Sequence, residues 1–165
     1  MSLTRYIART RNQRGLTLLE MILAMTILAV LASAVVPMAE MTTRRTKELE
    51  LRRSLRLIRT AIDEYKSDFD QAVAQKTIIP SIDETGYPES LATLVEGNDW
   101  GGLYPYKRKY LRRIPEDPFD LYQEGWGLRA YEDDPDSTFY SGGDVYDVYS
   151  QSQQYALDGT PYNTW

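Results

Sequence analysis

The first strong pattern in the sequence is an uninterrupted apolar run near its start. From residue 21 to residue 39 there is no charged side chain, and only Thr26, Ser33 and Pro37 interrupt the run. A helix of about 20 apolar residues is long enough to cross the hydrocarbon core of a bilayer. The run therefore predicts a membrane-spanning helix that is followed by a soluble part.

A secretory signal peptide is the alternative that the apolar run leaves open. Such a peptide ends in a small-residue cleavage site, and the stretch LASA at residues 31–34 fits that description. However, the apolar run continues through Val35, Val36 and Pro37 into charged, helix-like sequence without an intervening loop. This continuity favours a helix that is retained.

A second pattern follows, in which apolar residues recur at helical spacing. The intervals are 4, 3, 4, 3 and 4 residues, and the positions are Leu51, Leu55, Ile58, Ile62, Tyr65 and Phe69. This spacing predicts an amphipathic helix over residues 40–69 whose apolar seam packs on its own domain. A free coiled coil is the alternative, but the pattern lasts only about three heptads. Residues 40–50 lack the seam and are highly charged, so we expect them to be exposed in a monomer.

The rest of the chain predicts a small mixed head. Helical periodicity is lost after the seam, and residues 90–96 indicate a short helix. Two β-rich stretches follow at 127–131 and 145–150, and in the second Tyr146 and Val148 would share one face of a strand. The expected fold class is α+β: a long N-terminal helix, membrane-spanning in its first half and amphipathic in its second, packed on a small antiparallel β-sheet.

Composition removes several classes of chemistry. The sequence has no histidine and no cysteine, which excludes disulfides, thiolate metal sites and histidine-dependent catalytic triads. Residues 67–165 carry seven Lys or Arg against eighteen Asp or Glu, a net charge of −11. Proteins bind nucleic acid mainly through its phosphates, so we expect no nucleic-acid partner. A tethered hydrolase using Glu116 and Asp117 is the remaining enzymatic alternative, although adjacent acids on a turn are usually loop or cap residues.

The residues just before the apolar run form a motif. Four arginines and no acid precede Gly15, which is followed by Leu16, Thr17, two aliphatic residues and Glu20. This order resembles the cleavage and methylation site of type IV pilins and the related pseudopilins. The resemblance implies that a prepilin peptidase cuts after Gly15 on the cytoplasmic side and methylates the new amine of Leu16. The family usually has phenylalanine after the cut, and Leu16 is a conservative departure.

The resemblance also gives the acid in the apolar helix a role in assembly. A charge at the bilayer centre costs about 2.5–3.5 kcal/mol on insertion scales. Leu16 and Glu20 lie about 6 Å apart along a helix, so the amine of an incoming subunit can meet Glu20 of the subunit before it. An interfacial carboxylate that reaches the headgroups is the alternative. By the same resemblance, Pro37 marks where the helix bends or unwinds inside the filament.

The order of the later segments resembles one subfamily more narrowly. GYP, LATLVE, YLRRIPEDPF, YDVYS and Trp165 follow one another as in the major, G-type pseudopilin of type II secretion systems. This resemblance implies a structural subunit and not an enzyme. Residues 1–15 would be a cleaved basic leader, residues 16–39 a transmembrane and filament-core helix, and residues 40–165 a periplasmic head that includes the amphipathic helix 40–69.

Such a subunit resides in the inner membrane as a single-pass protein with a periplasmic head and assembles into a periplasmic pseudopilus for protein secretion. The implied partners are prepilin peptidase, further copies of the chain, minor pseudopilins, an inner-membrane assembly platform and membrane lipid. A type IV pilin or minor pilin for adhesion, motility or DNA uptake is the alternative. Many pilins close the head with a C-terminal disulfide, so the absence of cysteine favours the secretion branch.

The subfamily resemblance also raises calcium as a candidate ligand, with no other cofactor implied. Major pseudopilins usually bind one calcium ion in a loop after the last strand. Here the candidate ligands are Asp147, Ser150 and Asp158, with backbone carbonyls completing the six to eight oxygens that calcium requires. The alternative is a solvated turn at residues 157–160, held by Trp165 packing back on the sheet. A second acidic cluster, residues 132–137, is of the kind that is usually a solvated loop.

Overall fold

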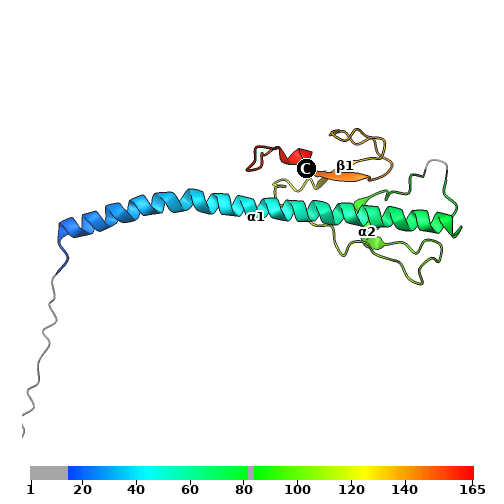
Figure 1. Cartoon of the computed structure of the whole chain (residues 1–165), viewed down its shortest axis with the longest axis horizontal. Helices are drawn as coiled ribbons and strands as arrows, with labels where there is room; N and C mark the ends of the chain where they lie inside the picture. Colours follow the sequence, from blue (N-terminus) through cyan, green and yellow to red (C-terminus); the bar gives the residue numbers. More distant parts are fainter. Residues whose placement is uncertain (1–14, 82–83) are drawn as a thin grey trace, which may run out of the picture. The chain divides into compact units, whose positions relative to one another are not determined.

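The structure is a computed structural model that describes residues 15–81 and 84–165 (Figure 1). Its elements are α1 (Leu18–Ala74), α2 (Leu91–Glu96), β1 (Trp126–Arg129), β2 (Asp147–Ser150) and the 3₁₀ turn η1 (Tyr162–Thr164). The chain divides into two compact units, Met1–Thr42 and Thr43–Trp165, and α1 contributes residues to both. The α+β class predicted from the sequence is confirmed.

The first unit consists, where it is described, of the apolar part of α1. Large side chains such as Leu18, Leu19 and Val30 are mostly exposed, and the most apolar stretch of the helix has a mean hydropathy of 2.4 with none of it buried. By length and composition, this is the one helix among the described residues that could cross a membrane. Position 37 lies within α1, so bending or unwinding in a filament stays a prediction. The leader predicted at residues 1–15 lies, up to residue 14, outside the described residues.

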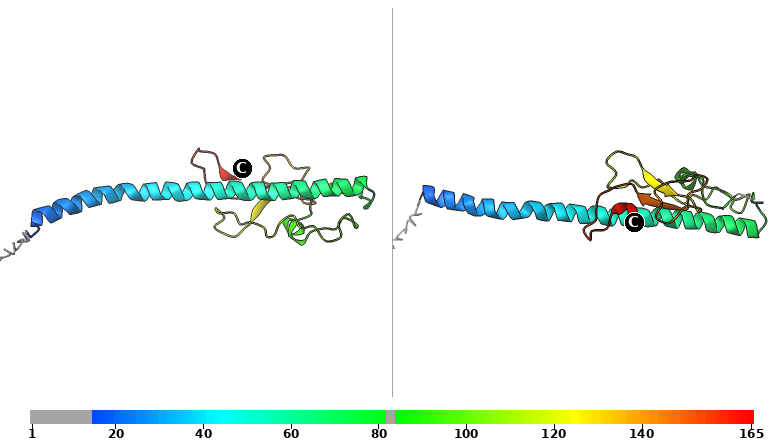
Figure 2. Two further views of the ribbon diagram at one scale, coloured as in Figure 1. Left: turned by 60° about the horizontal axis from the view of Figure 1, so that its bottom comes forward. Right: turned by 90° about the horizontal axis from the view of Figure 1, so that it is seen from above.

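The second unit is built around the other half of α1. Every residue of the predicted seam is buried, from Leu51 to Phe69, and the helix continues to Ala74, beyond the predicted end at residue 69. Leu94 of α2, Val148 of β2 and Tyr162 of η1 join the same core. Figure 2 shows the strands and η1 lying alongside this half of α1. The seam therefore forms the core of its own domain, as expected, and not a free coiled coil.

The small antiparallel sheet is present, but its strands are shorter than the β-rich stretches predicted at 127–131 and 145–150. β1 and β2 pair antiparallel, with Trp126 opposite Ser150 and Arg129 opposite Asp147. A Cβ atom at Gly127 would lie 2.3 Å from the ring of its partner Tyr149, so glycine there lets that ring cross the strand. Val148 is fully buried. Tyr146, which was predicted to share a strand face with Val148, lies before β2. Its side chain is 46% exposed, and its ring contacts the rings of Tyr87 and Tyr131.

Candidate processing and assembly site

The start of α1 is fixed by a side-chain cap. The Thr17 hydroxyl oxygen accepts a hydrogen bond from the backbone N–H of Glu20 at 3.2 Å, and the Thr17 carbonyl accepts one from Met21 at 3.1 Å. A threonine followed three residues later by glutamate is a recurrent helix start, and the first turn favours a negative charge because of the helix dipole. The Thr-x-x-Glu spacing is visible in the sequence. From the sequence alone, however, Glu20 was interpreted as a partner for the amine of Leu16, and the cap was not predicted.

The predicted cleavage bond lies just outside this helix. Gly15, Leu16 and Thr17 precede α1 without regular structure, and the side chain of Leu16 is 70% exposed. A Cβ atom added at Gly15 would meet nothing within 4 Å among the described residues. The described part of the chain therefore leaves room for a side chain at this position, and both residues of the bond between Gly15 and Leu16 are exposed.

Glu20 is the lone acid in the first turn, and its carboxylate is available. It is exposed beside large apolar side chains, including Leu19 and Leu23. Within the part of the chain that the structure describes, the Glu20 carboxylate forms no ion pair or hydrogen bond; only its backbone N–H is engaged, by Thr17. The site therefore combines an open peptide bond with an unpartnered carboxylate one helical turn further on.

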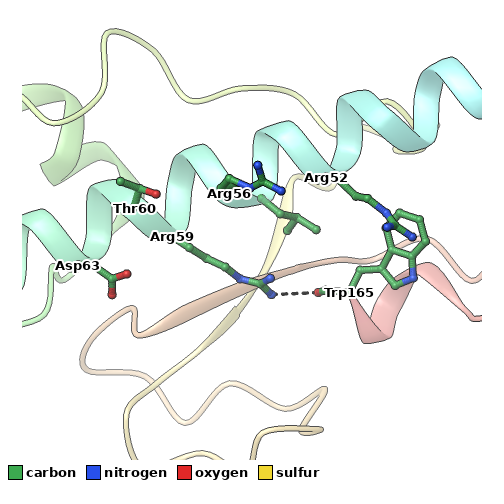
Figure 3. A pocket seen from close by; sticks show the side chains of 7 residues that line it. Arg52, Arg56, Arg59, Thr60, Asp63 and Trp165 are labelled. Carbon is green, nitrogen blue, oxygen red and sulfur yellow. Dashed lines mark hydrogen bonds between the residues drawn. The ribbon is translucent and has the colours of Figure 1, made fainter.

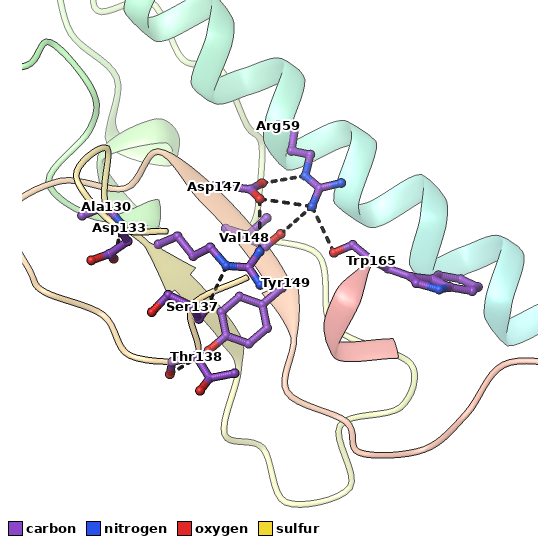
Figure 4. Close-up of polar contacts among 10 residues, drawn as sticks. Arg59, Ala130, Asp133, Ser137, Thr138, Asp147, Val148, Tyr149 and Trp165 are labelled. Carbon is purple, nitrogen blue, oxygen red and sulfur yellow. Dashed lines mark hydrogen bonds and ion pairs between the residues drawn. The ribbon is translucent and has the colours of Figure 1, made fainter. Parts of the chain in front are cut away.

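The residues proposed as calcium ligands have other partners. Asp147 accepts a hydrogen bond from Arg59 Nε at 2.6 Å and lies 3.3 Å from Arg129 Nη1, so two guanidinium groups neutralise it (Figure 4). Ser150 is fully buried, and its hydroxyl donates a hydrogen bond to Asp117. Asp158 accepts hydrogen bonds from the backbone N–H and the hydroxyl of Thr160, at 2.9 and 2.6 Å.

These three residues therefore do not fit a calcium site in this conformation. Calcium requires six to eight oxygen ligands, whereas the oxygens of Asp147 face two cations and Ser150 and Asp158 are engaged elsewhere. Across residues 15–81 and 84–165, no group of three or more acidic side chains is placed to hold a metal ion. The turn proposed at residues 157–160 is present, and Trp165 Nε1 donates to the Thr160 hydroxyl at 2.9 Å. Calcium binding is therefore an expectation of the subfamily resemblance alone, which these contacts do not support.

Glu116 and Asp117 lie in different surroundings. Asp117 is buried and accepts hydrogen bonds from the backbone N–H of Phe119 at 2.8 Å and from the Ser150 hydroxyl, so it fixes a turn against β2. Glu116 is exposed. Asp117 therefore has the role of a loop residue, whereas the structure gives Glu116 no such contact among the described residues.

The charged start of the amphipathic helix is less exposed than predicted. Glu48 accepts hydrogen bonds from the backbone N–H of Leu157 at 2.8 Å and from the Tyr162 hydroxyl at 2.9 Å, and Arg44 donates to the Tyr155 carbonyl. Burial raises the pKa of the Tyr162 hydroxyl, which keeps its proton for Glu48. The prediction that residues 40–50 are exposed is therefore wrong for the face that carries Arg44 and Glu48. Sequence periodicity could not reveal these contacts, because they are polar and leave no apolar pattern.

Comparison with known proteins adds one finding at this site. No curated protein and no solved structure matches the chain. Residues 10–36 match the family described as the prokaryotic N-terminal methylation motif, and this range contains Gly15, Leu16 and Glu20. Subunits with this motif are in general structural and not enzymatic, and the motif implies processing by prepilin peptidase. The match, together with the apolar helix that it covers, supports placing the chain in the type IV pilin superfamily as a membrane-anchored filament subunit of the periplasm or cell exterior.

Proposed function

We propose that the chain is a structural subunit of a periplasmic pseudopilus in type II protein secretion. Prepilin peptidase removes residues 1–15 and methylates Leu16. Residues 16–39 first cross the inner membrane and then form the filament core, and the remaining residues form the periplasmic head. The subunit polymerises with further copies and minor pseudopilins on an inner-membrane assembly platform.

One observation carries this proposal: the apolar part of α1 is exposed, and its only acid, Glu20, has no side-chain partner among residues 15–81 and 84–165. The large apolar side chains from Leu16 to Leu31 are exposed, and such a surface needs a cover. Lipid covers it before assembly, and the helices of neighbouring subunits cover it afterwards. The carboxylate of Glu20 then has a specific partner in the methylated amine of an incoming Leu16, because a charge left alone in that core is costly.

The secretion branch is supported by how the head holds together. It folds around α1 with no cysteine in the chain, whereas many pilins close the head with a disulfide. The order of α2, β1, β2 and η1 also follows the order of segments that resembles the major pseudopilins.

A type IV pilin or minor pilin is the second candidate, and one observation favours it. Major pseudopilins usually hold calcium after the last strand, but Asp147 is occupied here by Arg59 and Arg129. The head therefore departs from the subfamily pattern at a residue proposed as a ligand.

Deletion of the gene in its native host separates the two candidates. The proposal predicts that secreted proteins accumulate in the periplasm of the deletion strain, while surface adhesion, twitching motility and DNA uptake stay normal. Complementation with the wild-type chain should restore secretion, and complementation with Glu20→Leu should not. Normal secretion together with lost motility, adhesion or DNA uptake would favour the pilin candidate instead.

A further inference from the structure

A basic groove runs along α1 beside Trp165, within the second unit (Figure 3). Its volume is about 520 Å³, and its lining residues are Arg52, Leu55, Arg56, Arg59, Thr60, Asp63 and Trp165. The helical members are spaced so that they share one face of α1 over about 16 Å, at 1.5 Å per residue. The groove thus presents a row of three guanidinium groups with an aromatic ring at one end.

The three arginines differ in how far the chain itself uses them. Arg59 is committed, because it binds Asp147 and donates to the backbone oxygen of Trp165 at 3.0 Å. Arg52 lies over the Trp165 ring at 4.1 Å and pairs with Asp158 only at 3.8 Å, with both side chains more than half exposed. An exposed pair of this kind contributes little. Arg56 is exposed and forms no ion pair with any described residue.

This arrangement suits an acidic segment that also carries an aromatic side chain. Guanidinium groups bind carboxylates through paired hydrogen bonds. No ion pair with a described residue occupies the N–H donors of the Arg56 guanidinium. The Trp165 ring, with Arg52 stacked on it, offers an aromatic platform next to that charge. Asp63 adds one negative charge to the lining, so the attraction is centred on Arg52 and Arg56.

The chain carries a segment of this chemistry in the loop of residues 131–139. Glu132, Asp134 and Asp136 are exposed and form no ion pair with the described residues, and Phe139 is 75% exposed. Hydrogen bonds at both ends of the loop also hold its conformation. Asp133 accepts a hydrogen bond from the backbone N–H of Ala130 at 2.7 Å, and this contact lowers the pKa of its carboxyl below the usual value.

A second contact orders the far end of that loop. Arg129 Nε donates to the Ser137 carbonyl at 2.9 Å, while the same guanidinium reaches Asp147. A loop that is held in this way loses little conformational entropy when it docks. Its free carboxylates are therefore presented ready for a cationic partner.

We propose that the acidic loop 131–139 of one copy docks in the Arg52–Trp165 groove of the next copy in the filament. This inference rests on the proposed function, because it needs copies of the chain to stack. The groove and the loop are different surfaces, so the contact is heterologous and repeats along an open filament without closing into a dimer. It would hold neighbouring heads in register, while the apolar helices form the filament core.

The absence of native cysteine makes a direct test available. Two full-length chains, Thr60→Cys in the groove lining and Thr138→Cys in the loop, keep all the charges of both surfaces. They are co-expressed in cells that assemble filaments, and sheared filaments are treated with a short bismaleimide. We expect cross-linked heterodimers at about tenfold the level given by a matched control pair, Thr60→Cys with Glu116→Cys; that ratio corresponds to 1.4 kcal/mol. Glu116 is an exposed acid outside the loop.

A charge exchange provides the second arm of the test. Arg56→Glu and Asp134→Arg should each lower the filament yield, and the double variant should restore it. Filaments that form normally but cross-link no more than the control pair would overturn the docking proposal and leave the proposed function standing. Failure of the wild-type chain to be cleaved or to assemble would overturn both.

Discussion

Thr17 caps the backbone N–H of Glu20 at 3.2 Å, and so the helix that begins at Leu18 is fixed without using the Glu20 carboxylate. The structural task of starting the helix and the chemical task of offering a charge are therefore carried by different residues. This separation allows the two tasks to be tested by separate substitutions.

We expect Glu20→Leu to leave membrane insertion and cleavage intact but to reduce filament assembly strongly. A neutral residue inserts more easily, whereas the incoming amine of Leu16 loses its partner. Sheared-filament yield measures assembly, and membrane fractionation measures insertion.

Thr17→Ala is the matched control for Glu20→Leu. It removes the cap, at about 0.5–2 kcal/mol of helix stability, but keeps the carboxylate. We expect filaments from this variant at near wild-type yield. If Thr17→Ala impaired assembly as much as Glu20→Leu does, then helix initiation and not charge pairing would be the cause.

Gly15→Ala should block maturation without disturbing the chain. A methyl group at this position meets nothing within 4 Å, so any loss must arise in the peptidase, where the backbone has to approach closely. Co-expression with a prepilin peptidase should give the shortened band for the wild type only. Equal processing of the two chains would place the cleavage site elsewhere.

Asp147→Ala should destabilise the head, because Arg59 and Arg129 lose the carboxylate that they share (Figure 4). We expect a cost of about 1–3 kcal/mol, which corresponds to a drop of about 5–15 °C in the melting temperature of residues 43–165. Glu50→Ala, an exposed position on α1, is the control and should melt like the wild type.

The same melting experiment tests calcium. With Asp147 neutralised by two arginines, added calcium or a chelator should leave the melting temperature unchanged. A head that binds calcium would instead be stabilised in proportion to the logarithm of the calcium concentration above the dissociation constant.

The head should lose stability in acid through Asp120. The backbone N–H of Gly125 donates to its carboxylate at 2.8 Å, and this contact lowers the pKa of Asp120 below the usual value. A group whose pKa is lowered by folding stabilises the fold above its unfolded pKa of about 4, and that stability is lost as pH falls through the folded value.

We therefore expect a melting temperature that is flat above about pH 5 and declines below about pH 4. Asp120→Asn should melt lower at neutral pH and show a shallower acid decline. Glu116→Gln, an exposed acid, should follow the wild-type curve at every pH. Identical curves for Asp120→Asn and the wild type would show that Asp120 does not contribute to the acid sensitivity of the head.

The α1 seam was predictable because burial imposes a period on the sequence. Leu51, Ile58 and Ile62 repeat at helical intervals, and all three are fully buried. The cap at Thr17 could also have been predicted, from the spacing of Thr17 and Glu20. The processing motif could be recognised for a similar reason, since Gly15 and Glu20 lie close together in the sequence.

Contacts between distant residues could not be predicted in this way. Arg59 and Asp147 are 88 positions apart, and Glu48 and Tyr162 are 114 apart. A carboxylate near the last strand has the same appearance in the sequence whether it binds calcium or arginine. Only the fold reveals its partner, and so Asp147 was proposed as a metal ligand while the face containing Arg44 and Glu48 was expected to be exposed.

Cleavage after Gly15, methylation of Leu16 and polymerisation through the N-terminal helix can be measured together, as the intact mass of the protein recovered from sheared filaments. We expect a chain that begins at Leu16 and carries one added methyl group. Recovery of only the full-length, unmethylated chain, confined to the membrane fraction with none in filaments, would overturn the proposed function.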